Sequence, residues 1–257
     1  MTFRDHAGAA LAGAVAGLAG GLFGVGGGVL LVPMLTGFFR LSQHQAHGTS
    51  LAAIGATALA ALVVYAAHGN VAWATALPVG LASILTARYG ARWTTRFSKR
   101  SLARAFAVFL VLVAARMLWR VPAGSGLLFA SGWPGLALDL ALGAAVGLLA
   151  GFMGVGGGLI AVPAFTLLLG MSQQTAQGTS LAVILVTAPA GAFEHARHGN
   201  LVGRLVPGLA LGAVVGAPLA SWFAQSLPHE LLARAFALFL LANAAYGWIR
   251  SAGTVKA

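Results

Sequence analysis

The sequence contains no cysteine, and only four of its 257 residues are acidic. The absence of cysteine excludes disulfides, iron–sulfur clusters and thiol chemistry. The acidic residues are Asp5, Asp139, Glu194 and Glu230. Carriers of cations and protons commonly place a carboxylate within the membrane, so this scarcity favours an anionic substrate.

Charged residues of both signs are also scarce, at 7% of the chain, whereas 59% of the residues are hydrophobic. This composition is too apolar for a soluble domain of the same length. Apolar segments of about 16 to 25 residues recur along the whole chain, and the polar stretches between them are too short to fold alone. We therefore expect residues 1–257 to form one integral membrane domain that contacts the lipid bilayer.

The formal net charge is +11. The Lys and Arg residues stand at the ends of the apolar segments and form no basic face with interleaved aromatic residues, so we do not expect nucleic-acid binding. The start of the chain, residues 1–21, could pass for a secretory signal. The repeat described next favours a retained helix instead.

The chain is a tandem duplication with a shift of 130 residues. GLFGVGGGVLLVP, residues 21–33, returns as GFMGVGGGLIAVP, residues 151–163, with eight of thirteen positions identical. Three more stretches return at the same distance, namely GTSLA at 48–52, HGN at 68–70 and LARAFAVFL at 102–110, the last as LARAFALFL. We place repeat one at about residues 8–120 and repeat two at about 137–250.

Each repeat begins with an apolar run of about 30 residues that is broken at GVGGG. As one straight helix this run would be about 46 Å long, against a hydrocarbon core of about 30 Å. Two short helices joined at the glycines fit better, either as a re-entrant hairpin or as two tilted crossings. Three further apolar segments follow in each repeat, at 44–66, 71–92 and 101–119, and at 174–196, 201–223 and 231–250.

The positions of Lys and Arg distinguish two topologies. If the broken run crosses once, the repeats are parallel, and eight of these residues lie inside against seven outside. If it counts as a hairpin or as two crossings, the second repeat is inverted, and twelve lie inside against three outside. The positive-inside rule favours the inverted arrangement with both termini cytoplasmic. Its inside set is Arg4, Arg40, Arg88, Arg92, Arg96, Lys99, Arg100, Arg104, Arg197, Arg204, Arg250 and Lys256, and its outside set is Arg116, Arg120 and Arg234.

The two GVGGG breaks are the main candidate site. An inverted repeat brings equivalent discontinuities together near the membrane midplane, and unwound backbone there needs protein or water around it. We therefore predict that the breaks line a cavity and bind an anion through peptide N–H groups and the positive ends of the restarting helices. The alternative is that the glycines only allow close helix packing. The candidate residues are Gly24, Gly26, Gly27, Gly28, Gly154, Gly156, Gly157 and Gly158.

The paired motif GVGGG-xxx-VP, followed in each repeat by GTSLA, resembles the sulfite exporter TauE/SafE family of transmembrane sulfur-compound transporters. The resemblance covers nearly the whole chain. It implies transport of sulfite, sulfonates or related small sulfur anions across a bacterial inner membrane, and it does not identify the substrate.

Four hydroxyl residues of the GTSLA segments complete the candidate site, namely Thr49, Ser50, Thr179 and Ser180. They could donate to substrate oxygens, or they could bond back to carbonyls of their own helix. The HGN stretches predict short interhelical turns, with glycine supplying an unusual backbone angle.

A metal site is not expected, although His44 and His47, and His195 and His198, have a metal-like spacing. The repeat replaces His44 and His47 with Gln174 and Gln177, and His195 with Tyr65. No cysteine or converging carboxylate completes a ligand set, so we predict neither a metal nor another cofactor.

These observations predict an all-α polytopic transporter with inverted repeats that exports a small sulfur oxyanion by alternating access. We do not expect an enzyme, because no nucleophile, acid–base pair or metal set converges in the sequence. An anion channel, a transporter of another small organic anion and a scaffold subunit stay as alternatives, and a homo-oligomer stays open.

Overall fold

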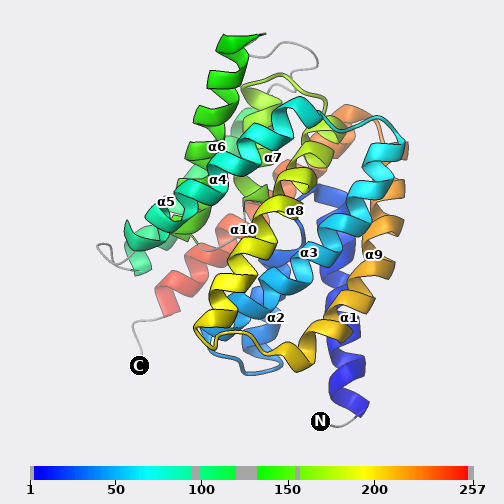
Figure 1. The fold of residues 1–257 in the computed structure, drawn as a ribbon, viewed down its shortest axis with the longest axis vertical. Coiled ribbons are helices and arrows are strands. Elements are labelled where there is room, and N and C mark those ends of the chain that lie inside the picture. Colours follow the sequence, from blue (N-terminus) through cyan, green and yellow to red (C-terminus); the bar gives the residue numbers. More distant parts are fainter. Residues whose placement is uncertain (1–2, 94–98, 120–131, 154–156, 254–257) are drawn as a thin grey trace.

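The computed structural model describes residues 3–93, 99–119, 132–153 and 157–253, and within these ranges it is helical and contains no strand (Figure 1). The predicted all-α class is confirmed. The first five helices are α1 Phe3–Phe23, α2 Gly28–Gly37, α3 Gln43–Ala67, α4 Trp73–Trp93 and α5 Lys99–Trp119. The remaining elements are α6 Trp133–Met153, α7 Gly158–Leu167, α8 Gln173–Arg197, the short 3-10 helix η2 Gly203–Leu205, α9 Val206–Ser226 and α10 His229–Gly253.

The helices follow the sequence repeat. The bounds of α6, α7 and α8 are those of α1, α2 and α3 displaced by 130 residues. Helix α9, with η2 before it, occupies the place of α4, and α10 occupies the place of α5. Each half therefore contains a long helix, a short helix after the glycine break, and three more helices.

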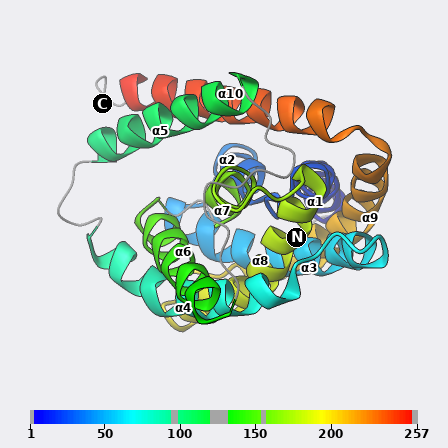
Figure 2. The ribbon, with the colours of Figure 1, turned by 90° about the horizontal axis from the view of Figure 1, so that it is seen from above.

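The two halves are interwoven. Helix α1 packs on α9 and α6 packs on α4, so the first helix of each half lies against the fourth helix of the other. The equivalent helices α3 and α8 pack together, as do α5 and α10. Figure 2 shows α5 and α10 on one side of the molecule, α3, α4 and α8 on the other, and α1, α2 and α7 between them. Neither half has a core independent of the other.

Small residues allow α1 and α9 to lie unusually close. A Cβ atom added at Gly17 would lie 2.9 Å from the Cα of Ala213, and one at Gly21 would overlap the carbonyl of Ala217. Glycines of α9 face α1 in the same way, with Gly216 against Ala14. Residue numbers rise together along both helices, so they are parallel. Gly13, Gly17 and Gly21 form the small-residue spacing of four that supports close packing of membrane helices.

Helices α3 and α8 run antiparallel. The Thr49 Oγ1 atom, near the start of α3, accepts a hydrogen bond of 3.0 Å from the backbone N–H of Val202, just beyond the end of α8. The Thr179 Oγ1 atom, near the start of α8, accepts an equivalent bond of 3.0 Å from Ala72, beyond the end of α3. Equivalent helices that pack antiparallel are related by an axis perpendicular to their length, which supports the inverted arrangement of the repeats.

The HGN stretches form the predicted turns. Gly69 and Gly199 have φ angles of 71° and 69°, in the left-handed region that glycine adopts without a Cβ clash. The backbone N–H of Asn70 then donates to the carbonyl of Tyr65, and that of Asn200 donates to His195. These bonds close the C-terminal ends of α3 and α8.

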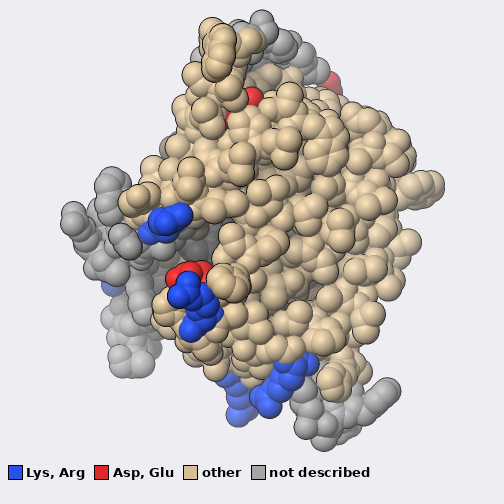
Figure 3. Space-filling model, in the orientation of Figure 1, with Lys and Arg blue, Asp and Glu red and all other residues tan. Residues whose placement is uncertain are grey.

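The outer surface suits a lipid environment. Six of the described helices are long and apolar enough to cross a membrane, whereas α2 and α7, of ten residues each, are about 15 Å long and too short to cross alone. On the face in Figure 3, Lys and Arg lie along the left and lower parts, and the broad right side carries none. Large apolar side chains on the outside include Leu59, Val63, Leu77, Leu81, Leu85, Leu211, Val215 and Leu219.

Candidate functional site

The first glycine break is a short left-handed stretch of backbone. After α1 ends at Phe23, Gly24, Gly26 and Gly27 have φ angles of 68°, 70° and 79°. An L-residue in this region places its Cβ too close to the next carbonyl oxygen, at a cost of about 1–2 kcal/mol per residue, and glycine avoids that cost. The glycines thus end α1 and let the chain reverse into α2.

The broken run is a hairpin with arms of unequal length. A Cβ atom added at Gly8, near the start of α1, would lie 3.6 Å from the ring of Phe39, which follows α2. The second arm therefore returns beside the first. The expectation of two short helices is wrong for the first arm, because α1 has 21 residues and stays helical up to Phe23. Its glycines before the break face α9, and that packing holds them in the helix.

The two breaks meet inside the molecule. A Cβ atom added at Gly158, where α7 begins, would lie 2.6 Å from the Cα of Val25 in the first break. The side chain of Ile184 lies against both Gly26 and Gly158. Helix α2 leads to the start of α3, and α7 leads to the start of α8. Because α3 and α8 are antiparallel, their starts lie at opposite ends, and the C-terminal ends of α2 and α7 lie far apart. Their N-terminal ends therefore point toward one another.

The meeting point is closed by apolar packing. Residues 24–28 are all buried, and the exposed fractions of Val25, Ile54 and Ile184 are 2%, 5% and 4%. The cavity expected at GVGGG is therefore not open at these described residues, because Val25 and the two isoleucines fill the space between the breaks. Of the second break, Gly157 and Gly158 are described, and Gly154 and Gly156 lie outside the described residues.

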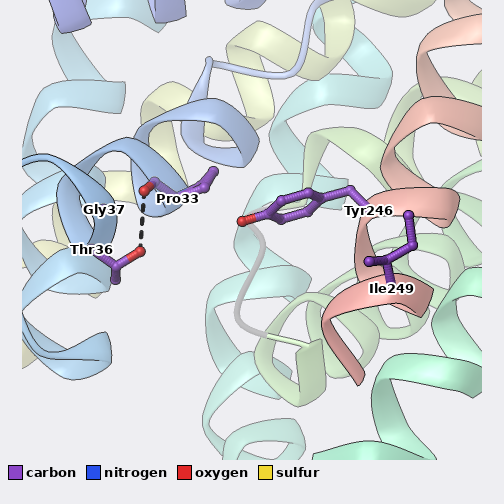
Figure 4. A pocket seen from close by; sticks show the side chains of 5 residues that line it. All are labelled: Pro33, Thr36, Gly37, Tyr246 and Ile249. Carbon is purple, nitrogen blue, oxygen red and sulfur yellow. Dashed lines mark hydrogen bonds between the residues drawn. The ribbon is translucent and has the colours of Figure 1, made fainter. Parts of the chain in front are cut away.

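A pocket of about 430 Å³ lies outside the meeting point, between α2 and α10. In Figure 4 the Tyr246 side chain extends from α10 toward α2, and Thr36 bonds back to the carbonyl of Pro33. Gly37 and Ile249 complete the lining. These residues carry no charge, and Thr36 and Gly37 lie in the last turn of α2, where the helix dipole is negative, so the pocket does not favour an anion.

The four hydroxyl residues of the candidate site form two groups, the serines beside the first break and the threonines against loops of the opposite repeat. The Ser180 Oγ atom donates to the carbonyl of Gly24 at 2.9 Å, which ties α8 to the first break. Ser50 is 1% exposed and lies beside Gly28, and within the described part of the chain its hydroxyl has no hydrogen-bond partner. Thr49 and Thr179 instead accept bonds from loops of the opposite repeat. The structure thus brings the serines, and not the threonine hydroxyls, to the breaks.

Two further residues contact the first break and were missed by the sequence analysis. The Tyr65 hydroxyl lies 2.9 Å from the carbonyl oxygen of Gly21 and 2.8 Å from Oε1 of Gln177. Both side chains are fully buried. The signal in the sequence was that both residues differ from their equivalents in the other repeat. Gln177 stands in the place of His47, and Tyr65 stands in the place of His195. This difference between the repeats was used only as an argument against a metal site.

A comparison with protein families identifies the chain. The family model described as "Sulfite exporter TauE/SafE" matches residues 3–117 and 138–256, which are close to the two repeats. The chain belongs to the TauE/SafE family. This confirms the resemblance seen in the paired glycine motifs, and it makes the protein a multi-pass membrane transporter of that family.

Relatives in the TauE/SafE family carry names of the same kind. A "Probable membrane transporter protein" from Xylella fastidiosa is 29% identical over 239 residues, covering 91% of this chain and 92% of the relative. The "Probable membrane transporter protein YunE" from Bacillus subtilis is 28% identical, with 80% and 85% covered. A relative from Haemophilus influenzae is 35% identical over 111 residues, with 40% and 42% covered. No solved structure gives a significant match.

In this TauE/SafE protein the described side chains nearest the glycines of the first break are uncharged. Glu194 and Glu230 are 62% and 72% exposed, near the ends of their helices. The described residues include no group of three or more His, Cys, Asp or Glu placed to hold a metal ion. Any attraction of a substrate to the breaks therefore depends on backbone dipoles and neutral side chains.

Proposed function

We propose that this TauE/SafE transporter exports small sulfur-containing oxyanions, such as sulfite or organosulfonates, across a bacterial inner membrane by alternating access. The substrate is held between the two glycine breaks. The family description and the transporter names of the relatives support the class of activity. The substrate and the mechanism are argued from the chemistry of the breaks.

The observation that carries the proposal is the convergence of two helix N-termini. Helix α2 starts at Gly28 and α7 at Gly158, and the breaks before them are in contact. The first N–H groups of a helix have no acceptor within it, and the helix dipole places partial positive charge there. Two such ends aimed at one point favour an anion without a charged side chain.

The proposed binding set combines the glycines with hydroxyl groups. It comprises Gly24, Gly26, Gly27, Gly28 and Ser50 with their equivalents Gly154, Gly156, Gly157, Gly158 and Ser180. Thr49 and Thr179 contribute by fastening each repeat to a loop of the other. Because each of these hydrogen bonds joins a helix of one repeat to a loop of the other, the bonds can couple the position of one break to that of the other.

The interwoven repeats support the proposal of alternating access. Apolar side chains close the breaks in this structure, so substrate entry requires the helices around them to separate. With the second repeat inverted, equivalent movements of the two halves open the site to opposite sides of the membrane. The inside-negative potential favours export, since moving one negative charge outward gains about 2.3 kcal/mol per 100 mV.

Flux measurements test the proposal. Proteoliposomes that contain the full chain should take up or release sulfite, in oxygen-free buffer, with saturation and counterflow, and at a rate that responds to an imposed potential. Gly27→Leu should abolish this flux, because Gly27 has a φ angle of 79° and an added Cβ would overlap the carbonyl of Ala16. Gly55→Leu is the control, since a Cβ at Gly55 meets no atom within 4 Å.

The alternatives predict different results. An anion channel gives flux without saturation or counterflow, and a transporter of another organic anion responds to carboxylates and not to sulfur anions. A scaffold subunit shows no flux with any of these anions. Sulfite efflux that ignores the membrane potential would contradict the electrogenic version of the proposal.

A further inference from the structure

A buried amide from repeat two lies directly against the first break. A Cβ atom added at Gly24 would lie 2.6 Å from both Cα and Cβ of Gln177. Gln177 is 0% exposed, and its Nε2 atom has no hydrogen-bond partner among the residues that the structure describes. A buried N–H donor without an acceptor destabilises the folded protein, which is a reason to look for a ligand that satisfies it.

Tyr65 orients this amide. Its hydroxyl reaches Oε1 of Gln177 at 2.8 Å and the carbonyl oxygen of Gly21 at 2.9 Å. A phenol has one proton, so it donates to one of these oxygens at a time. The hydrogen bond to Oε1 occupies the oxygen side of the amide and leaves its two N–H donors free.

The amide belongs to a row of side chains on α8 that follows the breaks. Gln177 and Ser180 contact Gly24, and Ile184 contacts Gly26 and Gly158. The equivalent row on α3 is His47, Ser50 and Ile54, of which Ser50 lies beside Gly28 with an unpaired hydroxyl. The two rows therefore place two buried donors from different repeats along the first break, Gln177 beside Gly24 and Ser50 beside Gly28.

We propose that Gln177 binds the substrate directly and helps to select an oxyanion, with the Ser50 hydroxyl as a second side-chain donor. The inference rests on the proposed function, and it adds the side chains that the glycine motif cannot supply. A pyramidal or tetrahedral oxyanion has several acceptor oxygens, so it can occupy the helix ends, the amide and the hydroxyl together. A ligand without such oxygens leaves the amide unsatisfied.

Binding of sulfite and of sulfoacetate to the purified full chain tests this role. Gln177→Met keeps the length of the side chain and removes both donors. Gln177→Glu keeps an acceptor for Tyr65 and introduces a negative charge. We expect each variant to bind both probes about 10- to 100-fold more weakly than the wild type, as for a lost hydrogen bond to a charged group.

Gln173→Met is the matched control. Gln173 lies one turn earlier on α8, is also 0% exposed and also has an unpaired Nε2, but its Oε1 lies beside Thr166 and its backbone N–H donates to His229. The control should bind both probes within about twofold of the wild type. Equal weakening by Gln173→Met would overturn the proposal, because the loss would then reflect α8 as a whole.

The outcomes separate the two levels of inference. If the wild type binds the probes and both folded Gln177 variants bind them equally well, Gln177 is not a ligand and the proposed function stands. If the wild type binds neither probe, the proposed function and the role of Gln177 fail together. Should Gln177→Met not fold, as judged by size-exclusion chromatography, the Gln177→Glu variant decides the question.

Discussion

At the scale of single residues, equivalent positions in the two repeats have acquired different partners. Ser180 donates to the carbonyl of Gly24, whereas the hydroxyl of Ser50 is buried with no partner in residues 3–93, 99–119, 132–153 and 157–253. Tyr65 of repeat one and Gln177 of repeat two form a hydrogen-bonded pair, and the residues at the equivalent positions are His195 of repeat two and His47 of repeat one. The fold is nearly two-fold symmetric, but the chemistry around the breaks is not.

The two serines provide a matched prediction. Ser180→Ala should lower the free energy of unfolding by about 1–3 kcal/mol, because it leaves the buried Gly24 carbonyl without its donor. Ser50→Ala removes no hydrogen bond, so it should leave stability almost unchanged and weaken sulfite binding instead. Thermal unfolding in detergent and equilibrium binding measure the two effects. Equal loss of stability in both variants would show that Ser50 also has a structural partner.

At the scale of the helices, glycine has two separate uses in this protein. In the breaks it permits left-handed backbone, as at Gly27. In α1 and α9 it permits close parallel contact, as at Gly17 and Gly216. The sequence analysis kept close packing as the alternative explanation for GVGGG, and the break glycines are also closely packed, as at Gly27 against Ala16 and at Gly158 against Val25.

Alanine substitutions distinguish glycines of the packed face from others in helices. Gly17→Ala should destabilise the protein by about 1–3 kcal/mol, because the added Cβ forces α1 away from α9. Gly55→Ala should be neutral or stabilising by up to about 1 kcal/mol, since glycine is a poor helix former and the site has room. Unfolding temperatures of the two purified variants provide the comparison. A stable Gly17→Ala protein would contradict the close packing of these helices.

At the scale of the whole molecule, antiparallel pairs of equivalent helices set the arrangement. For α3 and α8, the antiparallel packing is shown by the hydrogen bonds that Thr49 and Thr179 accept from backbone N–H groups just beyond the end of the opposite helix. For α5 and α10, the guanidinium of Arg104, near the start of α5, lies 5.2 Å from the ring centroid of Trp248, near the end of α10. In a membrane we expect this arrangement to place corresponding loops of the two repeats on opposite sides.

Single cysteines test the inverted topology, because the chain has none of its own. His68 and His198 are exposed residues of the two HGN turns, 130 residues apart. A membrane-impermeant maleimide added to intact cells should label His68→Cys, and His198→Cys should react only after the membrane is opened. Labelling of both from the same side would support the parallel arrangement and reject the inverted one.

Several features could be predicted from the sequence because they depend on local backbone chemistry or on composition. The helical membrane class follows from long apolar segments, and the glycine breaks and HGN turns follow from the conformations that only glycine adopts easily. The duplication is visible because the repeated stretches stand in the same order. Each of these signals lies within one segment or in the comparison of two segments.

The tertiary structure alone decided which segments meet. The bond between Tyr65 and Gln177 joins residues 112 positions apart, and that between Ala72 and Thr179 joins residues 107 positions apart. The pairing of α1 with α9 likewise crosses between the repeats. Such contacts depend on how the two halves interlock, and each half taken alone is equally compatible with packing on itself. The sequence by itself thus determined the helices and their interruptions, and the interlocking of the repeats determined what surrounds the site.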